Sequence, residues 1–366
     1  MICKAKFVVV FGLGTLLLFI GCDDPVSSNG SPDITRSIVS VNTSSDYSEG
    51  NTALYDIEND SAYTNLLSLD SDNGIKTYNG SIYILQKTQN TVIKITGSNI
   101  SPTTVDNEEN VGDATNIHDI AFISNTKAYI TQYDATDVVI YNPATGEKTG
   151  ENVDLASYCP EESGTPNMDA AVYYGGNVYI GLQKLDDSYD ATDNSSVVVI
   201  DAQTDDVTEE IILDEKNPQG MSLYGDKLYI ACTGGYGVQD GGIEVIDLSS
   251  NQTEGVLVTE EELEGDVSDV FIFDDTRGYA VVAGANWSNS VICFDPSDGS
   301  IIETLSSVDN AAMAGLASDG TYLYVADRSS ETPGLLIFDP DDNSLVSGPH
   351  DLGMPPNAIA YLDTEE

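Results

Sequence analysis

Short apolar stretches separated by polar turns recur along the chain from about residue 34. In each copy the apolar residues end in an aromatic residue or Ile, usually followed by Asp and a short polar turn. The copies are Leu54–Asp56, Ile93–Thr96, Val139–Asn142, Val198–Asp201, Glu244–Asp247, Ile292–Asp295 and Leu336–Asp339. Consecutive copies end 40, 46, 59, 46, 48 and 44 residues apart. Such regular spacing indicates a repeat of one supersecondary unit.

A second pattern, apolar–Tyr–apolar after a turn, precedes most of these copies. It occurs at Ile82–Ile84, Ala128–Ile130, Val178–Ile180, Leu228–Ile230 and Leu323–Val325. The stretches are short and β-branched, and the turns are rich in Asn, Asp and Gly, which favours antiparallel strands. A repeat of roughly 40–50 residues with four strands per unit predicts an all-β fold, the β-propeller.

Counting strands predicts seven four-stranded blades. Inner strands are expected near residues 74–78, 119–123, 169–174, 220–224, 269–273, 314–317 and 357–362. The first blade, which begins near Ile34, has no inner strand before it, and the last inner strand has no partner after it. The C-terminal strand therefore completes the first blade and closes the ring, which leaves no open edge. The propeller spans 34–363, followed by an acidic tail at 364–366.

The first 21 residues are predicted to be a signal peptide. Lys4 and Lys6 precede the apolar run 7–20, which is too short for a comfortable membrane span. The segment Leu18–Cys22 resembles a bacterial lipoprotein box, which implies acylation of Cys22 and a flexible tether over 22–33. We expect a lipid-anchored protein of the bacterial cell envelope, at the outer membrane or cell surface rather than the inner membrane, that contacts the membrane through its anchor only.

The charge of the chain restricts its partners. It holds 61 acidic and 13 basic residues, for a formal net charge of −48. This excess repels phosphate groups, so we expect neither nucleic acid nor an anionic lipid surface as a partner. Cations, cationic ligands and basic protein faces are compatible with it. With 40% hydrophobic residues, the chain can still build a large core.

One face of the propeller collects the residues that could carry chemistry. In a four-stranded blade, the connection to the next inner strand and the loop between the second and third strands share a face, which we call the top face. Residues just before the inner strands form a ring there: Asn73, Asp119, Asp169, Gln219, Asp269, Met313 and Asn357. The carboxylates Asp119, Asp169 and Asp269 could hold calcium, which prefers oxygen ligands. The alternative is a solvated channel whose polar side chains hold water.

Loops between second and third strands add aromatic and charged side chains to the top face. We predict ligand contacts from Tyr133, Asp134, Tyr189, Asp190, Tyr236, Trp287 and Arg328. Aromatic rings on rigid loops often form contact surfaces, although each ring could instead pack over its own loop. An acidic ring edged by aromatic rings suits a cationic or amphipathic small molecule or protein partner.

The sequence offers little for catalysis. It has two histidines, no nucleophile elbow and no zinc-binding His-Glu-x-x-His motif, so we predict no catalytic residues and a non-catalytic binding protein. A metal-dependent lactone or ester hydrolase of propeller fold is the enzymatic alternative. A structural component of an envelope complex is a further alternative.

The repeats resemble those of YVTN/YncE-like seven-bladed propellers. The resemblance rests on Val198–Asp201 with Thr204 and on Leu228–Ala231, and it covers most of residues 34–363. Ser48–Asn51, before a Leu-Tyr-Asp strand, is similar to propeller lipoproteins of Bacteroidota. The resemblance implies a non-enzymatic binding protein, in some members at the cell surface and in one branch a capturer of cobalamin. It supplies no catalytic residue set.

Overall fold

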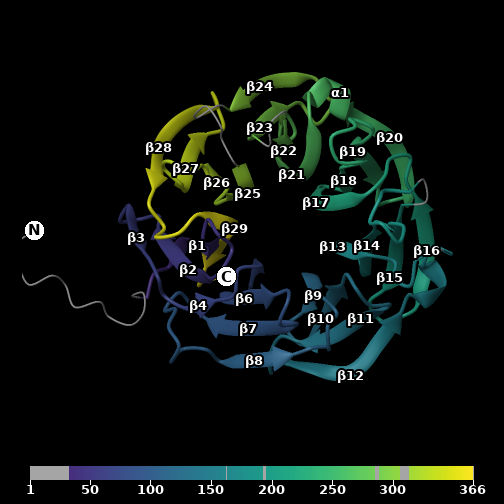
Figure 1. Ribbon diagram of the computed structural model, residues 1–366, viewed down its shortest axis with the longest axis horizontal. Helices are drawn as coiled ribbons and strands as arrows, with labels where there is room; N and C mark the ends of the chain where they lie inside the picture. Colours follow the sequence, from purple (N-terminus) through teal and green to yellow (C-terminus); the bar gives the residue numbers. More distant parts are fainter. Residues whose placement is uncertain (1–32, 162, 193–194, 285–287, 306–312, 366) are drawn as a thin grey trace, which may run out of the picture.

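The computed structural model describes residues 33–365 except 162, 193–194, 285–287 and 306–312. Seven antiparallel sheets surround a central axis as the blades of a propeller (Figure 1). From the axis outward, blade 1 contains β29 (Pro356–Asp363), β1 (Arg36–Thr43), β2 (Gly50–Asp56) and β3 (Ser61–Tyr63), with β4 (Ser68–Leu69) also paired to β2. Blade 2 contains β5 (Asn73–Tyr78), β6 (Ser81–Gln86), β7 (Thr91–Thr96) and β8 (Asn107–Asn110).

The other blades repeat this order. Blade 3 has β9 (Ile117–Ser124), β10 (Lys127–Gln132), β11 (Asp137–Asn142) and β12 (Glu147–Asp154), and blade 4 has β13 (Met168–Tyr174), β14 (Asn177–Leu182), β15 (Ser196–Asp201) and β16 (Val207–Ile212). Blade 5 has β17 (Pro218–Tyr224), β18 (Lys227–Cys232), β19 (Gly242–Asp247) and β20 (Gln252–Thr259). Blade 6 has β21 (Asp266–Asp274), β22 (Arg277–Ala283), β23 (Asn289–Phe294) and β24 (Ile301–Leu305), and blade 7 has β25 (Met313–Ser318), β26 (Leu323–Asp327), β27 (Gly334–Asp339) and β28 (Ser344–His350). Among the described residues, two short helices, η1 (Ala156–Tyr158) and α1 (Glu260–Leu263), lie in connections.

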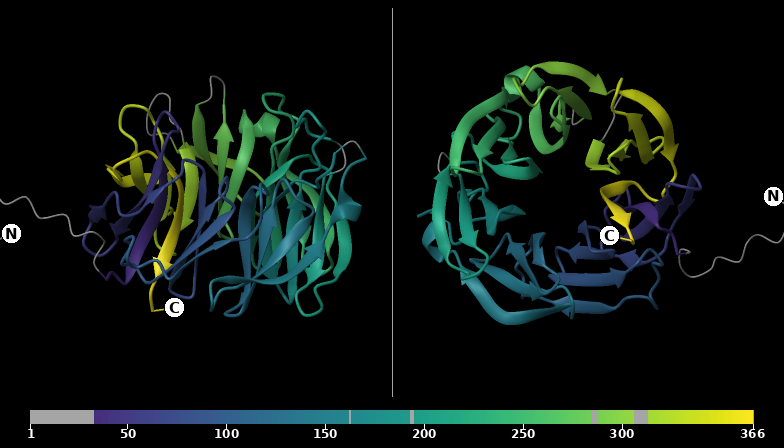
Figure 2. Two further views of the ribbon diagram at one scale, coloured as in Figure 1. Left: turned by 60° about the horizontal axis from the view of Figure 1, so that its bottom comes forward. Right: turned by 180° about the vertical axis from the view of Figure 1, so that it is seen from behind.

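The predicted closure of the ring is confirmed. Strand β29 lies beside β1 as the inner strand of blade 1, with Ile38 opposite Tyr361 (Figure 2). The Thr364 N–H also donates to the Thr35 carbonyl at 3.0 Å. Every inner strand expected from the repeat is present, and the blade count is seven.

The repeated Tyr of the second strand ties each of several blades to the next. The hydroxyls of Tyr179 and Tyr279 donate to the side-chain oxygens of Asn251 (2.8 Å) and Asn343 (2.9 Å) in the following blade. Both Asn residues have left-handed backbone, with φ of 53° and 56°, in turns between third and fourth strands. Asn tolerates this conformation better than most residues. The Tyr and the turn residue therefore recur together because they form one contact.

The repeated Asp at the end of the third strand closes the turn that follows it. The Asp201 Oδ1 accepts hydrogen bonds from the N–H groups of Gln203 (2.7 Å) and Thr204 (3.2 Å). In blade 6 the corresponding Asp295 accepts from the Ser297 N–H at 2.8 Å. Side chains of this kind stabilise turns by replacing a backbone acceptor. Much of the repeated acidity is thus used for turn formation.

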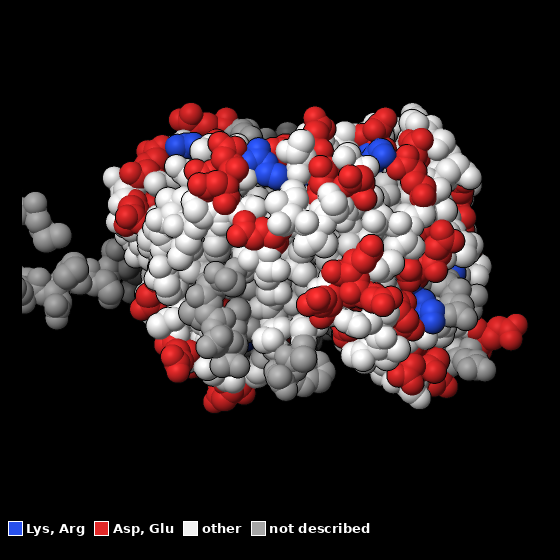
Figure 3. Space-filling model, turned by 90° about the horizontal axis from the view of Figure 1, so that it is seen from above, with Lys and Arg blue, Asp and Glu red and all other residues white. Residues whose placement is uncertain are grey.

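The hydrophobic core lies between adjacent blades rather than in one central mass. One cluster packs Val138 and Ile140 of blade 3 against Val178 and Val198 of blade 4, all at most 5% exposed. Acidic side chains are spread over the side of the ring seen in Figure 3, where basic ones are few. Within the part of the chain that the structure describes, no helix is long and apolar enough to cross a membrane.

Candidate functional site

Most inner strands carry a β-bulge where they begin at the top face. In six blades the inner strand has one residue more than the strand behind it at this point. In blade 4, Asp169 and Ala170 together oppose the single residue Gly181. A bulge breaks the alternation of side chains and re-aims those beside it. Blade 2 differs, because β5 and β6 pair without interruption from Asn73 to Tyr78.

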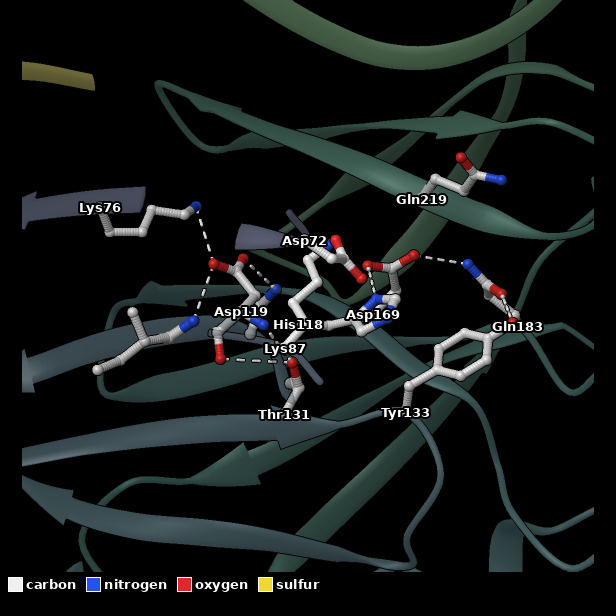
Figure 4. Close-up of polar contacts among 12 residues, drawn as sticks. Asp72, Lys76, Lys87, His118, Asp119, Thr131, Tyr133, Asp169, Gln183 and Gln219 are labelled. Atoms are coloured by element: carbon white, nitrogen blue, oxygen red, sulfur yellow. Dashed lines mark hydrogen bonds and ion pairs between the residues drawn. The ribbon is translucent and has the colours of Figure 1, made fainter. Parts of the chain in front are cut away.

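Lys76 and Asp119 join blades 2 and 3 at the channel. The Lys76 Nζ lies 3.1 Å from the Asp119 Oδ1 (Figure 4). The Asp119 carboxylate also accepts two backbone N–H groups, at 2.8 and 3.0 Å, the second from Ala171 of blade 4. The pKa of Lys76 is raised, first by Asp119 and less by Asp269 and Asp169. The Asp119 carboxylate therefore stabilises the charged form of the Lys76 ammonium group.

A second polar cluster links blades 3 and 4. The His118 Nδ1 lies 3.0 Å from the Asp169 Oδ1, and the Gln183 Nε2 donates to the Asp169 Oδ2 at 2.6 Å (Figure 4). The Tyr133 hydroxyl donates to the Gln183 Oε1 at 3.0 Å, and the Tyr133 ring stacks on His118 with centroids 4.5 Å apart. Burial raises the pKa of Tyr133. These four side chains hold one another in a single arrangement.

Asp269 has an unusual titration for an aspartate. Its pKa is raised to about 6, mainly by burial and to a lesser extent by the negative charges of Asp119 and Asp169. The Val270 N–H and the Lys76 ammonium oppose the shift. The three acids predicted for the ring thus lie close enough to influence one another through the channel.

A cavity of about 490 Å³ opens among these groups at the top face. Side chains of the inner strands of blades 1, 2, 3, 6 and 7 line it, together with residues that follow second strands. Among the residues that the structure describes, its charged lining consists of the cations Lys76, Lys87 and Arg328 and the carboxylate Asp119. The remaining polar lining residues are Asn73, His118, Ser268, Asn289 and Asn357.

The predicted ligand-binding residues lie in more than one place, although Asp134, Tyr189 and Tyr236 are close enough to Tyr133 to raise its pKa. Arg328 lines the cavity, whereas Tyr133 packs on His118. Tyr189 and Tyr236 are 62% and 64% exposed on their loops. Asp134 and Asp190 are also exposed. Trp287 lies outside the described residues.

The three predicted calcium ligands surround one channel, but each carboxylate has contacts within the protein. Asp119 pairs with Lys76, Asp169 pairs with His118, and Asp269 accepts the Val270 N–H at 2.9 Å. Among the residues that the structure describes, no group of three or more His, Cys, Asp or Glu side chains is arranged to hold a metal ion. Calcium at these positions stays a prediction.

Sequence reasoning missed Lys76 and Lys87, the cavity's two lysines. A signal for Lys76 existed in the repeat, because Lys76 lies opposite Tyr83, the Tyr that recurs in the second strand of most blades. The residues opposite the corresponding Tyr in other blades are uncharged: Ala121, Val172, Ser222, Phe271 and Ala317. A lysine at that position is an exception within the repeat.

Solved structures share this architecture at low sequence identity. AztD from Citrobacter koseri is 12% identical, with a TM-score of 0.55, and the match covers 89% of this chain and 98% of that one. Hydrazine synthase from Kuenenia stuttgartiensis is 15% identical, with a TM-score of 0.61, over 78% of this chain and 87% of that one. A functionally unknown protein from Desulfotomaculum acetoxidans is 12% identical, with a TM-score of 0.60, over 89% and 98% of the two chains.

No protein-family model and no curated protein matches the chain. The similar structures therefore show the fold and leave the function open. They agree with the fold that the resemblance to YVTN/YncE-like repeats implied. This chain is a seven-bladed β-propeller whose structural neighbours have mixed functions.

Proposed function

We propose that the protein is a non-catalytic binding protein that receives a small ligand in the cavity at its top face. The observation that carries this proposal is the cavity itself, of about 490 Å³ and lined by polar side chains from five blades. This size is within the range of small-molecule sites, roughly 300–1,000 Å³. The exposed rings of Tyr189 and Tyr236 stand on loops of the same face and add apolar contact area for a ligand or protein partner.

A large residue at the cavity wall tests the site. Asn289 lines the cavity at the start of β23, so Asn289→Trp should fill part of it. Ser344 is exposed on the outer strand β28, and Ser344→Trp is the matched control. Small molecules that raise the melting temperature of the wild type should lose this effect in Asn289→Trp and keep it in the control. Ligands that bind both variants equally would place the binding site elsewhere.

A hydrolase is the second candidate function, and the His118–Asp169 contact favours it. A carboxylate 3.0 Å from an imidazole that lines a cavity can orient that imidazole as a general base. Turnover of lactones or esters that disappears in His118→Ala would support this candidate over a binding protein. Chelation would then show whether the reaction also needs a metal ion.

We further propose that the propeller is tethered to the bacterial cell envelope through acylated Cys22, at the outer membrane or cell surface. Cys22 lies outside the described residues, so the proposal rests on the sequence. Strand β1 begins beside the end of β29, at the face opposite the cavity, so such a tether would leave the top face free (Figure 2). Cys22→Ala should abolish acyl labelling and release the protein from membranes; continued labelling of the variant would contradict the proposal.

A further inference from the structure

The cavity is a basic site in a strongly acidic protein. The whole chain has 13 Lys and Arg residues against 61 Asp and Glu residues. Three of the 13, Lys76, Lys87 and Arg328, line this one cavity, and among the described lining residues Asp119 is the only carboxylate. The net charge of these lining residues is therefore positive, opposite in sign to that of the whole chain.

The cations of the cavity differ in how far the protein already neutralises them. Lys76 has Asp119 at 3.1 Å. Lys87 has only a long contact, 3.9 Å, to Asp72, whose side chain is 48% exposed. Surface ion pairs of such length hold little energy, so the Lys87 ammonium can exchange this partner for another.

Arg328 has no acidic partner among the described residues. Its Nη1 donates to the Pro355 carbonyl at 3.3 Å, and its guanidinium lies 5.5 Å from the centre of the Tyr47 ring. The other arginines of the chain each pair with acids, Arg36 with Glu58 and Arg277 with Asp274 and Asp341. In a chain with this excess of acid, a guanidinium that pairs with no described carboxylate has N–H donors left for a ligand.

We infer that the cavity binds a small molecule through an anionic group, a carboxylate or a phosphate, held by Arg328 and Lys87. This inference rests on the proposed function, because it assigns the ligand chemistry of the same cavity. Arginine recognises both groups by paired N–H···O bonds, and lysine adds a point charge. Asn289 and Asn357, which also line the cavity, each donate one amide N–H to a backbone carbonyl and have a second N–H for the neutral part of the ligand. Asp119 does not compete with the anion because Lys76 and two backbone N–H groups already occupy its carboxylate.

Calorimetric titration of the full chain with four probes tests the inference. Citrate and inorganic phosphate represent the two anionic groups, and glycerol and choline serve as neutral and cationic probes. We expect at least one anion to bind, and Arg328→Gln to weaken its Kd tenfold or more. Lys87→Gln should weaken it several-fold. Arg36→Gln, the same change of charge outside the cavity, should leave the Kd within twofold of wild type.

The pattern of results separates this inference from the proposed function. Stronger binding of citrate than of phosphate would assign a carboxylate ligand, and the reverse a phosphate ligand. Anion binding that is equal in Arg328→Gln and Arg36→Gln, with unchanged melting temperatures, would overturn the inference. If no anion binds, but choline or glycerol binds and Asn289→Trp abolishes that binding, the inference of an anionic ligand is overturned. The cavity would still be the ligand site. Anion binding that Arg328→Gln weakens and Asn289→Trp abolishes would support both.

Discussion

Blades 2 and 4 present opposite charges to the channel because their inner strands pair differently with the strand behind. In blade 4 the bulge lies at Asp169, whose carboxylate contacts His118 and Gln183. In blade 2 the pairing is regular, Asn73 is 1% exposed, and Lys76 reaches across to Asp119 of blade 3. One extra residue in a strand therefore changes which side chain faces the channel, although both blades share the same four-stranded sheet.

The comparison also explains why the channel is not simply an acidic ring. Bulges in the neighbouring blades place the carboxylates Asp119 and Asp169 toward the axis, while blade 2 supplies Lys76 and Lys87. The acids are used to hold the blades and Lys76 together. The cations that remain for a ligand lie on the side of blades 2 and 7.

Removing a bulge should have the largest effect. Deleting Ala170 gives blade 4 the regular pairing of blade 2, and it withdraws Asp169 from His118. We expect a loss of about 3 kcal/mol or more in the free energy of unfolding, because a one-residue shift moves side chains to the wrong face. Urea unfolding measures the loss. Deletion of Asp187, in an exposed loop of the same blade, is the control and should cost much less; equal losses would show that the bulge has no special role.

A pH-dependent effect should follow at Asp269 in blade 6. The pKa of Asp269 is raised from 3.8 to about 6, so between these values the native state binds a proton that the unfolded state has lost. Stability from this group is therefore present at low pH and lost as pH rises through this window. Asp269→Asn removes the free-energy cost of ionising this carboxyl group. The difference in the free energy of unfolding between the variant and wild type should therefore be roughly 1–3 kcal/mol more in favour of the variant at neutral pH than at acid pH.

Urea unfolding near pH 4 and near pH 7 measures this difference. Asp134→Asn, at an exposed loop position, is the control and should show no such pH dependence. A constant difference between Asp269→Asn and wild type at both pH values would mean that Asp269 titrates as an ordinary aspartate.

Removing the Tyr hydroxyl contacts between blades should have the smallest effect, and the effect should again differ between blade 2 and blade 4. The Tyr179 hydroxyl of blade 4 donates to Asn251 at 2.8 Å, whereas the Tyr83 hydroxyl of blade 2 donates to the Pro143 carbonyl at 3.4 Å. Tyr179→Phe should lower the free energy of unfolding by about 1 kcal/mol, and Tyr83→Phe by about half as much, since the longer hydrogen bond is weaker. Thermal and urea unfolding of the two variants give the comparison. A larger loss for Tyr83→Phe would contradict this ranking.

The fold was predictable because its determinants repeat. The Tyr of the second strand contacts the Asn of a turn in the next blade, as in Tyr179 with Asn251 and Tyr279 with Asn343. The regular spacing of these residues therefore predicts the repeated blades. The missing inner strand of blade 1 then required β29. The site was less predictable, because a bulge adds one residue within a repeat whose length already varies. Lys76 lies three residues after the predicted ring position Asn73, and Lys87 directly follows the second strand, so neither stood at a position on which the prediction was based.

The pairing of β1 with β29 makes the order of the blades cyclic. Arg36 lies opposite Asp363, so the two ends of the propeller meet within one sheet. Joining them by a short linker and cutting the exposed turn between β19 and β20 would give a permuted chain with the same neighbours around every blade. Such permutations succeed where ends lie close together and the new cut falls in a surface turn. The same ring of blades should therefore form whichever blade comes first in the chain.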